Sequence, residues 1–385
     1  MKPPSTTRVF YVYPPLFQYR APFHERMREI LKPSGVEYNV VYSEASAHSK
    51  LKGDTIELPW AIKVPRYYIG PSRYNFVFQN ALGAIKGADL IIMQQENKLL
   101  LNYILHMRRL FNSTKIAYFG HGRNFQAPVR NGMGSLIKEL LATKVDWWFA
   151  YNDLSAKLVE QYGFPAERIT SFQNSIDMKK LLDEISSVSV EDVAARRTAL
   201  GLSSRNVGIF IGGIYAEKRI PFLIEAAKLI RKAVPDFELL IVGGGDEFEA
   251  ARNLARDCPF VRLMGPKYGR EKTELALLAN VFLMPGLVGL AVLDSFAYQT
   301  PMITTDYPFH SPEIDYLKHD ENGIIVSPWD DVQAYANGVI NFLKDPELRQ
   351  RLSTGAAAAS SLYSIEDMAK RFADGVLSAL DATSM

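Results

Sequence analysis

Short apolar segments alternate with helical patterns throughout residues 207–326, and this alternation limits the fold more than any other feature of the chain. The segments VGIFI, ELLIV, FVRLM, VFLM, MITT and GIIV each have the pattern of a buried strand. Strands that alternate with helices build a parallel sheet with helices on both faces. Ligands of such sheets bind beyond the carboxyl ends of the strands. The site is therefore expected among the residues that follow these strands, which include Lys218, Asp294 and Glu313.

The first half of the chain shows the same alternation of strands and helices. An amphipathic helix is expected at 21–33, where Pro33 stops it, and a second helix at 98–111. Residues 46–75 have few periodic signals and many aromatic residues, which favours an irregular excursion near the site. Strands are expected at 7–15, 36–44, 88–97, 115–122, 145–153 and 168–177.

A chain of 385 residues is long enough for two domains. The class expected is α/β with two Rossmann-like domains that face a cleft: an N-terminal domain at 1–177 and a C-terminal domain at 178–362. A charged helical segment begins at Asp177 and connects the two. Helical patterns follow at 331–344, 346–362 and 365–380, and the segment 363–385 is expected to pack back on the first domain.

The composition is that of an ordinary globular protein, with 48% hydrophobic and 22% charged residues. The single cysteine, Cys258, cannot form an internal disulfide, which fits a reducing cytoplasm. The first residues lack the apolar core of a signal peptide. The apolar runs also stay short of the roughly 18 residues that span a bilayer. These features favour a cytoplasmic protein, with peripheral contact at the inner face of the membrane as a further expectation.

The net charge of +2 hides a difference between the two halves. Residues 1–177 carry 22 basic and 14 acidic residues, whereas residues 178–385 carry 22 basic and 28 acidic residues. A basic domain can meet an anionic membrane surface or an acceptor that bears phosphate. Ordinary variation of surface charge between domains is the alternative. Nucleic acid is not an expected partner, because no dense basic run with interleaved aromatics is present.

Lys218 follows the strand VGIFI and precedes a long helical pattern. A lysine beside a helix N-terminus can hold a diphosphate, although an isolated lysine is more often a solvated surface residue. Gly243 and Gly244 follow the strand ELLIV, where they suit either a tight turn or close approach of a ligand. Gly212 and Gly213 stand before Lys218 and belong to the same candidate diphosphate site.

The segment GLVGLAVLDSFAYQTP is the sharpest local signal. Gly286, Leu287, Val288, Gly289 and Leu290 precede or begin a helix whose free amides can face a phosphate or a sugar hydroxyl.

Asp294 lies about one turn into that helix, among apolar residues. A carboxylate is costly there unless it is paired, and two adjacent hydroxyls such as those of a ribose would pair with it. The alternative is an ordinary aspartate on the helix surface.

Four residues are candidates for contacts with the acceptor or the transferred group. His121 ends the strand KIAYFG, where it can donate to a sugar hydroxyl or steady developing charge, although a lone histidine is more often structural. Arg123, Arg20 and Glu313 are candidate acceptor or sugar contacts. Glu313 has an alternative role as a first-turn acid of a helix.

The sequence shows no histidine or carboxylate pair at metal-ligand spacing, no GxSxG elbow and no complete P-loop. No metal is expected to be needed if Lys218 and helix N-terminal amides, as fixed positive groups, do the electrostatic work of a cation.

Together these residues resemble the retaining glycosyltransferases of family four, which have the GT-B fold. The likeness covers most of the chain and is strongest at 174–323. NSID is similar to the family's NGID, GGIYAEKR to its GRLxxEKG, and PGLVGLAVLDSFAYQTPMITTD to its ExGLxxLEAMAxGxPVVxT; PEI and a following NG also match. The resemblance implies that Lys218 binds the donor diphosphate, that Lys267 and Tyr268 of GPKYG contact the base, and that His121 lies near the donor sugar.

The sequence departs from the family pattern at three donor-site positions. Gly213 replaces an arginine that partners the lysine, Gly286 stands at the first glutamate of a two-glutamate motif, and Asp294 takes the place of the second. At Gly286 only main-chain groups remain to hold the donor sugar. The segment YPPLFQYRAPF also lacks the glycine pair of many relatives.

The function that the resemblance implies is transfer of a sugar from a UDP- or GDP-linked donor to an acceptor hydroxyl, with retention at the anomeric carbon and catalysis by Lys218 and His121. A lipid-linked or other glycan acceptor fits the basic N-terminal domain and the aromatics Trp60, Tyr67, Tyr68 and Phe76, which are expected to be exposed. Bacterial surface polysaccharide or glycolipid assembly is the setting expected. Two alternatives stay open: a sugar-nucleotide epimerase of similar architecture, and a non-catalytic sugar-nucleotide-binding subunit.

Overall fold

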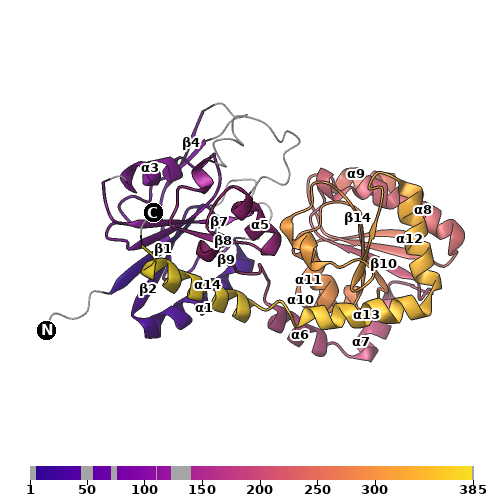
Figure 1. Cartoon of the computed structure of the whole chain (residues 1–385). Helices are drawn as coiled ribbons and strands as arrows, with labels where there is room; N and C mark the ends of the chain where they lie inside the picture. The colour runs from indigo at the N-terminus through magenta and orange to yellow at the C-terminus, as the bar shows by residue number, and fades with distance from the viewer. Residues whose placement is uncertain (1–5, 45–54, 71–75, 110, 123–139, 384–385) are drawn as a thin grey trace. The chain divides into compact units, whose positions relative to one another are not determined.

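The computed structural model describes residues 6–44, 55–70, 76–109, 111–122 and 140–383. The chain divides into two compact units (Figure 1). The N-terminal unit contains Met1–Ile176 and Ile365–Met385, and the C-terminal unit contains Asp177–Ser364. The terminal helix therefore belongs to the same unit as the first strands of the chain.

A seven-stranded parallel sheet forms the centre of the N-terminal unit, in the order β3-β2-β1-β6-β7-β8-β9. Strand β1 begins with Thr7 and Arg8 and is buried from Val9 onward, because helices cover both faces of the sheet. The strands are β1 (Thr7–Tyr13), β2 (Val36–Tyr42), β3 (Ile62–Lys63), β6 (Leu90–Gln94), β7 (Lys115–Gly120), β8 (Trp147–Ala150) and β9 (Ile169–Ser171).

Two further strands, β4 (Arg66–Ile69) and β5 (Phe76–Gln79), form a separate antiparallel pair. The expectation of an irregular segment at 46–75 is thus wrong for residues 62–63 and 66–69, which form β3 and β4. Tyr67, Tyr68 and Phe76 are exposed on this pair. Trp60 is not exposed as expected, because it is partly buried against the core and its Nε1 donates to Glu25 Oε1 over 2.7 Å.

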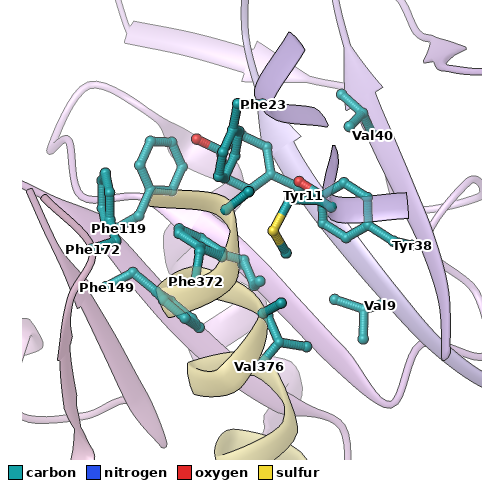
Figure 2. Packing of buried hydrophobic residues seen from close by; sticks show 14 of the residues in the cluster. Val9, Tyr11, Phe23, Tyr38, Val40, Phe119, Phe149, Phe172, Phe372 and Val376 are labelled. Atoms are coloured by element: carbon teal, nitrogen blue, oxygen red, sulfur yellow. The ribbon is translucent and has the colours of Figure 1, made fainter. Parts of the chain in front are cut away.

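The terminal helix α14 (Ile365–Asp381) completes the core of the N-terminal unit. Its apolar residues recur at helical spacing, so that one face of the helix is buried. Figure 2 shows Phe372 among the aromatic residues of this core, and its ring stacks on Phe149 with centroids 4.0 Å apart. The described residues of the unit also form the helices η1 (Gln18–Arg20), α1 (Ala21–Leu31), η2 (Lys32–Ser34), α3 (Leu100–Arg109), α5 (Asp153–Gln161) and η4 (Ala166–Arg168).

A six-stranded parallel sheet forms the centre of the C-terminal unit, in the order β12-β11-β10-β13-β14-β15. Numbered within the unit, this order is 3-2-1-4-5-6, which is the strand order of the dinucleotide-binding fold. The strands are β10 (Val207–Ile211), β11 (Glu238–Val242), β12 (Val261–Gly265), β13 (Val281–Met284), β14 (Met302–Thr305) and β15 (Gly323–Val326).

Helices connect and cover these strands. Three of them begin at aspartate caps, since the Asp177, Asp331 and Asp345 side chains accept hydrogen bonds from main-chain N–H groups of the first turn. The helices are α6 (Met178–Ser186), α7 (Val190–Ala199), η5 (Ala216–Lys218), α8 (Ile220–Ala233), α9 (Phe248–Leu254), α10 (Gly269–Ala276), α11 (Ala291–Ala297), η6 (Pro312–Tyr316), α12 (Val332–Lys344) and α13 (Pro346–Ser360).

The strand order places one point of divergence in each sheet. In the C-terminal unit β10 and β13 are neighbours, and the chain continues from them toward opposite edges of the sheet. In the N-terminal unit the corresponding neighbours are β1 and β6. Ligands of open parallel sheets bind beyond the carboxyl ends of strands at such points. The segments after β10 and β13, and those after β1 and β6, are therefore the places to look for a site.

Candidate functional site

Lys218 connects the segment that follows β10 with the loop that follows β13. Its side chain turns inward and is only 5% exposed. The ammonium Nζ donates to the carbonyl oxygen of Leu287 over 2.5 Å, lies 3.7 Å from the sulfur of Met284, and lies 5.5 Å from the ring centroid of Tyr215. A positive charge is thus held within the protein at the point where the fold leads one to expect an anionic ligand.

The environment of Lys218 makes its charge responsive to a ligand. Burial lowers the pKa of the ammonium to about 8, although the carboxylates of Glu313 and Glu217 act in the opposite direction. Glu313 is itself buried, in η6. The ammonium is therefore charged at neutral pH but poorly compensated by solvent, and the arrival of a diphosphate would stabilise the charged form.

The loop between β13 and α11 is fixed by main-chain bonds to both sides. The Leu287 N–H donates to Glu217 O over 2.8 Å, and the Ser311 N–H donates to Val288 O over 3.0 Å. Because these bonds and the one from Lys218 engage the main chain of Leu287 and Val288, both residues act first as supports of the loop. Their predicted contacts with the donor stay predictions.

Gly286 lies in direct contact with the segment that carries Lys218. A Cβ atom at this position would lie 2.2 Å from Glu217 O and 2.7 Å from the carbonyl carbon of Lys218, closer than atoms can approach. A side chain is therefore excluded here by the path of the main chain. The glutamate that the family pattern carries at this position would not fit this loop, which is a physical reason for the departure at Gly286.

His310 supports the same loop and was not recognised from the sequence. Its ring is buried; Nδ1 accepts from the Val288 N–H over 2.9 Å, and Nε2 donates to Thr305 O over 2.8 Å. Because a carbonyl can only accept, the ring is the neutral tautomer with its proton on Nε2. Burial lowers its pKa to about 4, and Lys218 contributes in the same direction. In the sequence, the only feature that could have pointed to His310 was its position two residues before the PEI motif.

The glycine segments after β10 and β11 pack directly on one another. The Gly212 N–H donates to Val242 O, and the Ile214 N–H donates to Gly244 O. Gly243 has a φ of 148°, and a Cβ there would lie 1.8 Å from Gly212 O. At Gly213 the ring of Tyr215 fills the space that a side chain would need, since its Cε1 would lie 2.8 Å from a Cβ. Close contacts of Gly212 with Gly243 and of Gly213 with the Tyr215 ring thus determine the path of the main chain that leads to Lys218.

Asp294 does not share a partner with Lys218. Its Oδ1 accepts from Nζ of Lys272 on α10 over 2.9 Å, and the two side chains are 18% and 21% exposed. Burial of the Lys272 ammonium disfavours its charged form, but Asp294 outweighs this effect and raises the pKa of Lys272. The sequence analysis missed Lys272. Lys272 therefore compensates the charge of the Asp294 carboxylate. The predicted contact of Asp294 with a ribose stays a prediction.

The other candidate residues of the C-terminal unit have more solvent or free space around them than Lys218 and Gly286 do. Tyr268 is 74% exposed at the start of α10, and Lys267 lies 3.4 Å from the Glu271 carboxylate. Gly289 and Leu290 directly precede α11, and a Cβ at Gly289 would have its nearest neighbour at 3.9 Å.

In the N-terminal unit, His121 and Arg20 approach the same tyrosine. His121 follows β7, and its ring meets that of Tyr151 edge-on with centroids 4.2 Å apart. The guanidinium of Arg20 lies 5.6 Å from the Tyr151 ring centroid. Arg123 lies outside the described residues.

Within the described ranges, no group of three or more histidine, cysteine or carboxylate side chains is placed to hold a metal ion. None of the helices in these ranges combines the length and the apolar character that crossing a bilayer requires.

The C-terminal unit is similar in sequence to known glycosyltransferases. Residues 194–359 match the family model described as glycosyl transferases group 1. An alpha-D-kanosaminyltransferase of Streptomyces kanamyceticus is 27% identical over 176 residues, which are 43% of this chain and 45% of the relative. A phosphatidyl-myo-inositol mannosyltransferase of Mycobacterium leprae is 24% identical over 182 residues, 46% of this chain and 48% of the relative. The chain thus spans about half the length of these curated relatives in each match.

A solved structure matches over nearly the whole chain. The crystal structure of Anabaena HepE in complex with UDP has a TM-score of 0.70 at 16% identity and covers 97% of this chain and 100% of its own. At this identity the likeness establishes the fold, and the expected α/β fold of the GT-B class is confirmed.

Proposed function

Residues 194–359 belong to the glycosyl transferases group 1 family, and from this premise we propose that the chain moves a sugar from a nucleotide-sugar donor to an acceptor hydroxyl. In this proposal the C-terminal unit binds the donor and the N-terminal unit binds the acceptor. The donor is a UDP- or GDP-linked sugar. UDP is the ligand in the crystal structure of Anabaena HepE, whose fold the chain shares.

The observation that carries the proposal is the buried ammonium of Lys218 at the divergence of β10 and β13. When the bond between the anomeric carbon and the donor phosphate breaks, negative charge grows on the departing diphosphate. A fixed cation of low solvent exposure stabilises such charge more strongly than water does. Lys218 is held in place by Leu287 before a ligand arrives, so little reorganisation accompanies the reaction.

The finer chemistry is part of the same proposal. The acceptor oxygen forms a bond to the anomeric carbon on the face that the diphosphate leaves, so the configuration is retained, and the acceptor proton passes to a phosphate oxygen. Lys218 supplies the positive charge that a metal ion supplies elsewhere, so the reaction proceeds without a metal. His121, at the carboxyl end of β7, is proposed to contact the transferred sugar.

The setting is proposed from the charge and surface of the N-terminal unit. Tyr67, Tyr68 and Phe76 are 51%, 50% and 42% exposed on the β4–β5 pair, and aromatic side chains of this kind favour a membrane interface. We place the protein in the cytoplasm, peripherally at the inner face of the membrane. Its acceptor would be a lipid-linked or other glycan in surface polysaccharide or glycolipid assembly.

A two-step experiment tests the proposal. Thermal unfolding with UDP, GDP and their common sugar conjugates identifies the donor, because a bound ligand raises the midpoint by mass action. The donor so found is then incubated with and without a panel of glycan and lipid acceptors. Transfer that requires an acceptor supports the proposal. An epimer formed from the donor alone identifies an isomerase, and binding without turnover across the panel identifies a non-catalytic subunit.

A further inference from the structure

Arg20 is buried at the place where the N-terminal sheet diverges. It closes the segment that follows β1 and directly precedes α1. Its guanidinium lies over Tyr19, with 5.1 Å to the ring centroid, and over Tyr151, the residue that follows β8. The side chain thus lies among the carboxyl ends of the strands, where parallel sheets bind ligands.

The charge of Arg20 has no carboxylate partner among the described residues. The residue is 4% exposed, and its Nη1 has the sulfur of Met368 as a hydrogen-bond acceptor at 3.8 Å. A guanidinium stays charged at every pH that proteins tolerate. Buried charges are normally paired, because removing an ion from water without compensation is costly.

Two other partly buried arginines of the described residues follow that rule. Arg109 donates to Asp146 over 2.5 Å, and Arg196 donates to Glu274 over 2.6 Å. Arg20 is surrounded instead by tyrosines and by His24, whose pKa is lowered to about 3 by burial and by Arg20 itself. His24 is therefore neutral and offers no charge, and its Nε2 is buried without a hydrogen-bond partner.

We propose that Arg20 binds an anionic group, a phosphate or a carboxylate, of the acceptor that the N-terminal unit holds. A planar guanidinium with several N–H donors in a fixed fork suits the oxygens of either group. The Tyr19 and Tyr151 rings contact the guanidinium before the ligand arrives. Tyr19, whose ring centroid lies 5.1 Å from the guanidinium, is 40% exposed, and in this proposal a rotation of its side chain admits the ligand. The inference rests on the proposed function only in naming the ligand as the acceptor.

Stability measurements separate a ligand-binding arginine from a structural one. Arg20→Met removes an unpaired buried charge, so its denaturation midpoint should equal or exceed that of the wild type. Arg109→Met is the matched control in the same unit, and its midpoint should fall because Asp146 loses its partner. If Arg20→Met lowers the midpoint as much as Arg109→Met does, the guanidinium is structural and the proposal is wrong.

Binding measurements identify the anion and its source. In a Lys218→Met background, which lacks the ammonium of the donor site, inorganic phosphate should still bind, and the added Arg20→Met should weaken it at least tenfold. Arg20→Lys, which keeps the charge but loses the fork, should give an intermediate affinity. Equal phosphate affinity with and without Arg20 would overturn the proposal.

The last measurement compares the affinity of Arg20→Met and of the wild type for the donor nucleotide UDP. With Lys218 intact, Arg20→Met should bind UDP within twofold of the wild type. A tenfold loss of UDP affinity in Arg20→Met would instead assign Arg20 to the donor diphosphate and contradict its assignment to the acceptor. These results do not depend on whether transfer is observed, so failure of this inference and failure of the proposed function remain distinguishable.

Discussion

The carbonyl oxygen of Leu287 accepts a hydrogen bond of 2.5 Å from the buried ammonium of Lys218. This contact joins the segment that follows β10 to the loop that follows β13, and it orients the cation before a ligand is present. A diphosphate that binds there gains a charge partner whose position is already fixed.

Donor affinity should fall as the pH rises from 7 to 9. Burial lowers the pKa of Lys218 to about 8, so the free protein loses the charge within this range, and a bound diphosphate holds the proton more tightly than the free protein does. Calorimetric titration of the donor nucleotide sugar at several pH values measures the effect. The matched variant Lys218→Met should bind weakly at every pH in this range, and an equal decline in both proteins would refute this origin.

The same group should affect the stability of the free protein. The lysine has a pKa of 10.5 in the unfolded chain and about 8 in the folded chain, so between these values the unfolded state binds more protons. The free energy of unfolding should therefore rise from pH 8 to 10.5 in the wild type relative to Lys218→Met. Denaturant titration of both proteins measures the difference, and the opposite sign would show that the ammonium is stabilised by its surroundings.

Replacing His310 by alanine should loosen the donor loop. The buried Val288 N–H loses its acceptor, which costs roughly 1–3 kcal/mol in the free energy of unfolding, and donor affinity should fall with it. His319→Ala is the control, because His319 also accepts a main-chain N–H but is exposed. Denaturation and donor titration of both variants suffice. Comparable, small losses in the two would show that the loop does not depend on His310.

Gly286→Ala should be far more disruptive than Gly289→Ala. The added methyl at Gly286 meets Glu217 O at 2.2 Å, whereas at Gly289 the nearest atom is 3.9 Å away. Overpacking of this kind costs roughly 1–3 kcal/mol, and it displaces the main chain next to Lys218. Unfolding midpoints and donor affinities of the two variants provide the test. If Gly286→Ala matches the wild type in both, the loop takes a different path.

Lys272→Met leaves the Asp294 carboxylate without its partner and should lower the free energy of unfolding by roughly 1–3 kcal/mol. This loss is smaller than the roughly 3–5 kcal/mol that breaking a fully buried ion pair costs, because the pair is partly exposed. The double variant Lys272→Met/Asp294→Leu should recover part of that loss in a thermodynamic cycle of unfolding. A double variant whose loss of stability equals the sum of the two single losses would argue against coupling of the two residues.

Much of the fold could be predicted because most of its strands and helices follow from local patterns of apolar and polar residues. The strands from Val207 to Val326 are short apolar runs ended by glycine, proline or charge, and the alternation defines the sheet of the C-terminal unit. The three last helices also lie where helical spacing placed them. Residues 62–63 and 66–69 were misread as irregular, because β3 has only two residues and β4 has only four, which pair with the next strand along the chain, β5.

The candidate site was predicted only in part, for a physical reason. Lys218 could be found because a lysine after a strand and before a helix has a recognisable place in the sequence. His310 and Lys272 act through bonds to residues 22 positions away in each case, and no local pattern marks such contacts. Arg20 likewise gave only a weak signal, since the lack of a carboxylate partner is visible only in three dimensions.

The most direct test of the central claim is calorimetric titration of UDP and GDP into the wild type, Lys218→Met and Lys228→Met at pH 7. Lys228 is an exposed lysine on α8 that pairs with Glu225, so its variant controls for the loss of one positive charge. The account predicts that the wild type and Lys228→Met bind one of the two nucleotides equally well, and that Lys218→Met binds it at least tenfold more weakly. Equal affinity in Lys218→Met and the wild type, with the variant folded, would contradict the account.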